Sequence, residues 1–273
     1  MNKLFQMVSK IGDIGKGGKK AMSKDETIKL ADIGIKGKVF CLSMQRSGTS
    51  SVGDFLEQWG LKRSGHQLSR QLNWSRHWYD GNFEAIFSDS SFQAHDVYED
   101  DPFWMPDFYK YVYHRVPDSR FILLYRDSDS WFKSMVRHSN GFSIGRADIH
   151  AKVYRREDEL RWLVKNIPGF EGGAPKAMVL YDKAAHYKAA YERHLAEVES
   201  FFSGPRAKYL FLAKLADPET WPKMKEWLGL PEKEGIRMES HAHRAKTEFT
   251  KANLLRNAAE WGLERTDPKG RKK

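Results

Sequence analysis

An arginine followed by small hydroxyl residues and a glycine stands where an apolar segment gives way to a helical pattern. The apolar segment is 38–43, and the polar residues after it are Arg46, Ser47, Gly48, Thr49, Ser50 and Ser51. Such a loop offers backbone N–H groups, the start of a helix adds partial positive charge, and the arginine adds a full charge. These residue types in this order predict a site that binds a phosphate or a similar anion.

Alternating strands and helices must position this loop. Segment 38–43 is almost continuously apolar, which is typical of a central parallel strand. Helical spacing follows it at 49–59, and two further strands are predicted at 120–125 and 208–212. Helices are predicted between and after the strands, at 107–115, from 127 onward, and at 148–165, 176–202 and 217–228. The pattern predicts an α/β fold, a three-layer sandwich with a central parallel sheet, in which the loop lies at the carboxyl edge of its strand.

Composition limits the function classes. The chain has 273 residues and a net charge of +10, which suits an anionic ligand but also nucleic acid or an acidic membrane surface. Its one cysteine, Cys41, lies in the first predicted strand, so a disulfide within the chain is impossible and a reducing, cytoplasmic location is expected. We find neither an apolar run as long as a membrane span nor a secretory signal.

Three regions are expected along the chain. Residues 1–37 form a basic N-terminal arm, 38–230 the α/β domain, and 231–273 a charged C-terminal extension that completes or flanks the nucleotide site. The arm is either mobile and solvated or makes peripheral membrane contact through a short amphipathic turn, whose apolar residues are Leu4, Met7, Val8 and Ile11.

The loop differs from that of the nucleotide triphosphatases, whose pattern is G-x-x-x-x-G-K-[ST]. Ser43 stands at the first glycine position and Thr49 at the lysine position. The loop instead resembles that of the sulfotransferases that use 3′-phosphoadenosine 5′-phosphosulfate (PAPS). Their strand-loop-helix reads basic-Ser-Gly-Thr-[Ser/Thr], and residues 46–50 match it. The resemblance implies a P-loop-like nucleotide-binding fold.

The second signature of that family also has a counterpart here. Arg126 ends the strand at 120–125 and Ser134 follows eight residues later, in the form R-D-x-x-x-W-x-x-S. A weaker likeness is Tyr191-Glu-Arg-His194 on a long helix. Taken alone, Arg126 would be an ion-pair partner of Asp127 or Asp129, and Ser134 an ordinary helix surface residue. Together the matching pieces span roughly 38–230 in the expected order.

The resemblance implies PAPS as co-substrate, with no metal. PAPS carries a 5′-phosphosulfate and a 3′-phosphate, so it needs two anion sites. Residues 46–51 would hold the 5′ end, and Arg126 with Ser134 would hold the 3′-phosphate. Arg46 would stabilise the leaving group, although many family members have lysine there, which is the better proton donor.

A general base must accept the proton of the acceptor group. The candidates lie between the two anion sites and are His95, Asp96, Asp100 and Asp101. Asp101 ranks first, because Asp101-Pro102 resembles an element of the family, followed by Asp96 and then His95. This acidic segment could equally be a solvated loop. The glycine-rich stretch that many family members place around the adenine is absent, and residues 239–246, with His241 and His243, stand in about its place.

The acceptor itself is not readable from the sequence. A hydroxyl or amine of a small molecule, glycan or lipid would suit the chemistry, and four aromatic residues could stack on it or belong to the core: Trp74, Trp78, Tyr79 and Trp104. Three alternatives stay open: a P-loop kinase-like phosphotransferase, a non-catalytic basic binding module for nucleic acid or acidic glycan, and an inactive nucleotide-binding relative. No specific nucleic-acid motif is found.

Overall fold

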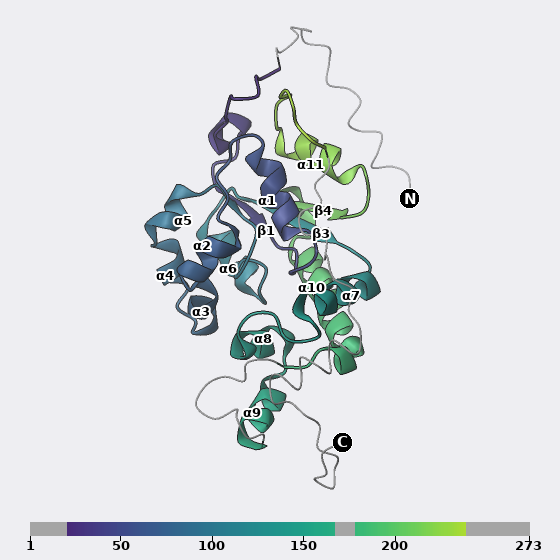
Figure 1. Cartoon of the computed structure of the whole chain (residues 1–273). Helices are drawn as coiled ribbons and strands as arrows, with labels where there is room; N and C mark the ends of the chain where they lie inside the picture. Colours follow the sequence, from purple (N-terminus) through teal and green to yellow (C-terminus); the bar gives the residue numbers. More distant parts are fainter. Residues whose placement is uncertain (1–20, 167–177, 239–273) are drawn as a thin grey trace.

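Four parallel strands form the centre of the molecule (Figure 1). The computed structural model describes residues 21–166 and 178–238. The strands are β1 (Val39–Cys41), β2 (Val97–Tyr98), β3 (Arg120–Tyr125) and β4 (Leu210–Lys214), in the order β2-β1-β3-β4. Phe40 of β1 is paired with Tyr98 of β2 and with Phe121 of β3. The predicted α/β fold with a central parallel sheet is confirmed.

Two apolar layers lie on opposite faces of this sheet, because side chains alternate along a strand. Phe40 and Leu123 belong to one cluster, together with buried residues of the helices α3 to α8 and α10. Cys41 and Ile122 belong to the other, with buried residues of α1 and α11. β1 is buried along its whole length. The sheet is therefore the middle layer of three, as predicted.

Helices connect and follow the strands in the described part of the chain. Their bounds are α1 (Thr49–Glu57), α2 (Gly65–Gln71), α3 (Trp74–Tyr79), α4 (Glu84–Phe87), α5 (Ser90–Ala94), α6 (Phe108–Arg115), α7 (Ser128–Ser139), α8 (Ala147–Tyr154), α9 (Glu157–Asn166), α10 (Ala184–Phe201) and α11 (Thr220–Leu228). Short 3₁₀ helices span Leu30–Ile33, Tyr181–Lys183 and Gly204–Tyr209. The segment 61–95, which gave no clear pattern, contains four of the short helices.

Several predicted boundaries are wrong. The helix predicted at 148–165 is two helices, because Arg155 adopts a left-handed conformation (φ 55°) that ends α8. α10 begins at Ala184 after a 3₁₀ turn rather than at 176, and residues 176–177 lie outside the described part. The 3₁₀ helix at 204–209 occupies the predicted start of the last strand, so β4 begins at Leu210 rather than at 208.

Both ends of the described chain pack against the domain. Ile28, Leu30 and Ile35 are buried in the cluster that contains α1. Met22 pairs with Lys233 in an isolated parallel bridge. Residues 21–37 of the expected arm are thus joined to the beginning of the expected C-terminal extension. The amphipathic turn near residues 4–11 and the histidines at 241 and 243 lie outside the described residues.

Candidate active site

The direction of the strands decides which candidate residues meet. In a parallel sheet, all residues that follow a strand lie at the same edge. The loop after β1, Glu99–Asp101 after β2 and Arg126 after β3 therefore share one edge. His95 and Asp96 precede β2 and lie at the opposite edge, where Asp96 Oδ2 accepts a hydrogen bond from Lys62 N at 2.9 Å. Of the candidate bases, the structure brings Asp100 and Asp101 to the edge of the loop, and leaves Asp96 and His95 at the other edge.

Backbone conformation shapes the loop between β1 and α1. Arg46 has φ 69° and Gly48 has φ 95°, both in the left-handed region. A Cβ added at Gly48 would lie 2.7 Å from Cδ1 of Leu215, a side chain that can shift, so it is the left-handed conformation that favours glycine here. Gly48 is also the N-cap residue of α1 and offers no side-chain acceptor to the first turn. The N–H groups of that turn, which contains Thr49, Ser50 and Ser51, are suited to an anion.

Hydrogen bonds join the start of this loop to β3 and to α10. The buried Ser43 Oγ accepts a hydrogen bond from the backbone N–H of Leu124 at 2.7 Å. The imidazole of His194 bonds the carbonyl oxygen of Leu42 at 2.8 Å. Burial lowers the pKa of His194 to about 4, so the ring is neutral and its Nε2 donates this bond. The serine at the first glycine position of the triphosphatase pattern thus has a structural role.

Tyr191 of α10 joins the two predicted anion sites. Its hydroxyl oxygen accepts a bond from the backbone N–H of Arg126 at 3.0 Å and one from Ser47 Oγ at 3.2 Å. Its ring stacks on Trp131 at 4.3 Å between centroids, and Trp131 Nε1 donates to the carbonyl oxygen of Gln45 at 2.9 Å. The residues of the weaker sequence likeness therefore hold the strand ends together.

The arginines from the two strand ends converge. Arg46 Nε lies 3.4 Å from Ser134 Oγ, and Arg126 Nη1 donates to the carbonyl oxygen of Arg46 at 3.3 Å. Burial lowers the pKa of Arg46, and the positive charge of Arg126 lowers it further. A bound anion would relieve this repulsion, so the residues present fit an anionic ligand.

The acidic neighbours of Arg126 are engaged elsewhere. Asp127 caps α7 by accepting a bond from the N–H of Ser130 at 3.0 Å. Asp129 pairs with Lys188 at 2.8 Å. The guanidinium of Arg126 donates instead to Ser130 Oγ at 3.1 Å and to the loop.

Asp101 lies in an environment that favours its protonated form. Ser75 Oγ donates to Asp101 Oδ2 at 3.3 Å, and Ser69 Oγ donates to the Asp101 carbonyl oxygen at 2.5 Å. Burial raises the pKa of Asp101 to about 8, and the charge of Asp100 acts in the same direction. A carboxylate with a raised pKa is a stronger base than an exposed one.

Two pairs at this edge have no recognisable signal in the sequence. Gln45 Nε2 donates to the hydroxyl oxygen of Tyr154, 109 residues away, at 2.9 Å. The buried Glu99 accepts from Arg63 Nε at 2.6 Å. A Cβ at Gly53 of α1 would lie 2.6 Å from both Arg63 Nε and Glu99 Oε1, so the glycine makes room for this ion pair.

The aromatic residues that could have stacked on an acceptor belong mostly to the core. Trp74, Trp78 and Trp104 are each less than 5% exposed. Tyr79 is half-buried at the end of α3, where the guanidinium of Arg76 lies 4.7 Å from its ring centroid.

The described residues offer neither a cluster of metal ligands nor a membrane-spanning helix. No group of three or more His, Cys, Asp or Glu side chains in 21–166 and 178–238 is arranged to hold a metal ion. Within the same ranges, each helix is too short or too polar to span a bilayer.

A comparison with known protein families gives a match over most of the chain. A family model described as "Sulfotransferase domain" matches residues 38–246, which is most of the chain. No curated protein matches the sequence. The matched range includes the loop after β1, the carboxyls after β2, Arg126, Ser134 and α10. The chain therefore belongs to the sulfotransferase family.

Proposed function

We propose that this sulfotransferase moves a sulfuryl group from PAPS to a hydroxyl or amine of a small-molecule acceptor, in the cytoplasm. The convergence of Arg46 and Arg126 carries the proposal. Each arginine follows a different strand, and Ser134 lies within hydrogen-bond reach of Arg46. Two adjacent cationic sites match a nucleotide that is phosphorylated at both its 5′ and 3′ positions.

The chemistry divides between the two sides of the site. The acceptor oxygen or nitrogen attacks sulfur and forms a new bond to it, while the bond between sulfur and the bridging phosphate oxygen breaks. Asp101 takes the proton from the acceptor group. Arg46 stabilises the negative charge that grows on the leaving phosphate oxygen. The products are the sulfated acceptor and adenosine 3′,5′-bisphosphate.

Nucleotide preference separates this proposal from a kinase-like activity. We expect adenosine 3′,5′-bisphosphate to raise the melting temperature, with a stabilisation of about 2.7 kcal/mol at 100 times its Kd. ATP with Mg²⁺ should have a much smaller effect. Transfer of ³⁵S from labelled PAPS to a panel of phenols, alcohols, amines, lipids and glycans then identifies the acceptor. Stabilisation by ATP–Mg²⁺ alone would favour the kinase-like alternative, and salt-sensitive DNA binding without nucleotide dependence would favour the basic binding module.

Arg126→Ala tests the 3′-phosphate site. Loss of a charged hydrogen bond to phosphate costs about 1.5–3 kcal/mol, so the Kd for adenosine 3′,5′-bisphosphate should rise about 10- to 100-fold. The Kd for adenosine 5′-monophosphate, which lacks the 3′-phosphate, should change much less. Isothermal titration calorimetry with both nucleotides measures the difference, and Arg137→Ala, an exposed arginine on α7, is the control. Equal losses for both nucleotides would contradict the assignment.

A further inference from the structure

Helix α8 contacts both sides of the proposed site. Its first turn meets α3, the helix that carries Ser75, and its last residue meets the loop that carries Arg46. An eight-residue helix is about 12 Å long, so its ends can reach two separate parts of the molecule. The contacts at each end are specific and polar.

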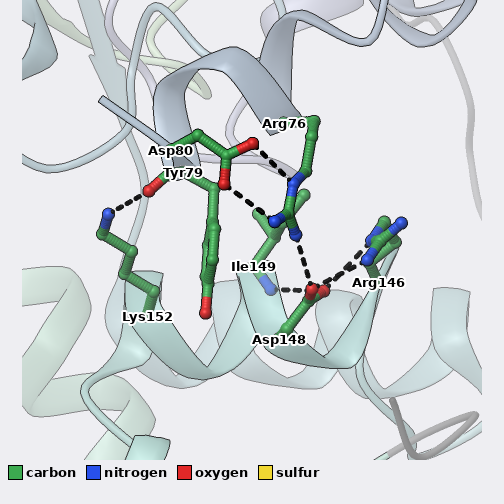
Figure 2. Close-up of polar contacts among 7 residues, drawn as sticks. All are labelled: Arg76, Tyr79, Asp80, Arg146, Asp148, Ile149 and Lys152. Carbon is green, nitrogen blue, oxygen red and sulfur yellow. Dashed lines mark hydrogen bonds and ion pairs between the residues drawn. The ribbon is translucent and has the colours of Figure 1, made fainter. Parts of the chain in front are cut away.

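Figure 2 shows the first end. Asp148 of α8 accepts from Arg76 Nη1 of α3 at 3.1 Å and from Arg146 Nη2 at 2.8 Å. One turn further on, Lys152 Nζ donates to the carbonyl oxygen of Tyr79, the last residue of α3, at 2.6 Å. Burial raises the pKa of Asp148, but its hydrogen bonds and the neighbouring arginine charges have a larger opposite effect, so the pKa is lowered. The hydrogen bonds come from Arg146 and the Ile149 N–H, and the charges are those of Arg146 and Arg76. The contact between α3 and α8 is therefore fully charged at neutral pH.

Ser75 connects this contact to Asp101. Ser75 directly precedes Arg76 on α3, and its hydroxyl donates to Asp101 Oδ2. α3 is only six residues long, so Ser75 and Arg76 lie on the same short helix, and a shift of the helix would move both.

Tyr154 forms the second end. Its ring is 1% exposed, and its hydroxyl oxygen accepts from Gln45 Nε2 in the loop directly before Arg46. The helix between the two ends is held against α10, because His150 Nε2 lies 2.7 Å from the hydroxyl of Tyr187. Burial raises the pKa of Tyr154, and the charge of Asp101 contributes to the shift, so the two residues lie within electrostatic range.

We propose that α8 sets the position of the donor-binding loop relative to Asp101 on the acceptor side. Arg76, Asp148 and Tyr154 are then positioning residues for sulfuryl transfer. The inference rests on the proposed function, because Asp101 is there the base and Arg46 the group that stabilises the leaving oxygen. Reacting groups that are misplaced by about 1 Å lose up to about 100-fold in rate, so a small shift of either side would be measurable.

A double-mutant cycle tests the inference. Arg76→Leu and Tyr154→Phe should each lower kcat about tenfold, while the Kd for adenosine 3′,5′-bisphosphate stays within about threefold of the wild-type value. If both residues act through α8, either substitution alone already removes its positioning effect. The kcat of the double variant should then also fall only about tenfold. A loss near 100-fold, the product of the single effects, would show two independent roles and overturn the proposal. Arg76→Lys keeps the charge and should recover most of the activity.

The control is an arginine that joins two other helices. Arg115 of α6 pairs with Glu84 of α4 at 3.0 Å, and its side chain is similarly exposed, at 47% against 39% for Arg76. Arg115→Leu should leave kcat unchanged within about twofold. A tenfold loss in this variant would show that loosening any two helices lowers the rate, and would overturn a specific role for α8.

Amide hydrogen exchange on the nucleotide-free protein gives a readout that does not need the reaction. Arg76→Leu should speed exchange in α3 and also in residues 43–48, which Arg76 does not touch, by about three- to tenfold. Wild-type exchange at 43–48 in this variant overturns the inference. If the wild-type enzyme failed to use PAPS, the proposed function would fall, but this measurement would still decide whether α8 couples the two sides.

Discussion

Asp101→Asn is expected to lower kcat by about 10²- to 10⁴-fold, which is the usual contribution of a general base. The substitution keeps the size of the side chain and an oxygen that can accept from Ser75, so the geometry should survive. Binding of adenosine 3′,5′-bisphosphate should remain, because Arg46 and Arg126 are unchanged. Steady-state kinetics and calorimetry on the same preparation measure both quantities. An Asp101→Asn variant that retained wild-type turnover would move the base elsewhere.

Asp96→Asn is the matched control for that result. Asp96 is the same residue type in the same segment, but it precedes β2 and bonds Lys62 N at the other edge of the sheet. Asparagine can still accept that bond, so turnover should stay within about twofold of wild type. His95→Gln should behave in the same way, because the imidazole Nδ1 lies 2.7 Å from the carbonyl oxygen of Ser91, not at the loop.

The same carboxyl should govern the pH profile. Its pKa is raised to about 8 by burial and by Asp100, and a base acts only when unprotonated. The wild-type kcat/KM should therefore rise with pH and level off above an apparent pKa near 8, a value that belongs to the Asp100–Asp101 pair. In Asp101→Asn this limb should disappear.

Stability should change in the opposite direction to activity. The ordinary pKa of aspartate is about 3.9, so between about pH 4 and pH 8 the folded state binds more protons than the unfolded state. The free energy of unfolding therefore falls as pH rises through this window, and Asp101→Asn removes that dependence. At pH 8 the inactive variant should melt at a higher temperature than wild type. A variant that is both inactive and less stable would indicate lost structure rather than a lost base.

The parts of the site that lie at strand ends were accessible from the sequence. The apolar runs at 38–43 and 120–125 can be recognised from short stretches of sequence. The residues that follow them are of the types that bind an anion. The structure places Arg46 within reach of Ser134 and Arg126 beside the Arg46 carbonyl oxygen, while the division of these residues between a 5′ and a 3′ site stays a prediction. The structure also gives a physical reason for the family-like residues Tyr191 and His194: both side chains form hydrogen bonds with backbone groups at strand ends.

Other features depend on contacts that no spacing encodes. β2 has only two residues, so its direction, which separates Asp101 from Asp96, emerges only when the sheet is assembled. The pairs Gln45–Tyr154 and Arg63–Glu99 join distant segments whose polar residues look like surface residues in the sequence. The break between α8 and α9 rests on the conformation of Arg155, a residue type with no preference for a left-handed turn.

Arg46→Ala should lower kcat by about 10²- to 10³-fold, equivalent to about 3–4 kcal/mol of lost stabilisation of the leaving oxygen. Arg46→Lys should stay within about tenfold of wild type, because it keeps the charge and can also donate its proton to that oxygen. Lys133→Ala, an exposed cation one residue before Ser134, removes the same charge without reaching the loop and should have little effect. If Arg46→Ala raised only the KM for PAPS, with kcat unchanged, the arginine would bind donor and transition state equally. Its role would then be anchoring the 5′ end, and the stabilisation of the leaving group would have to come from the N–H groups at the start of α1.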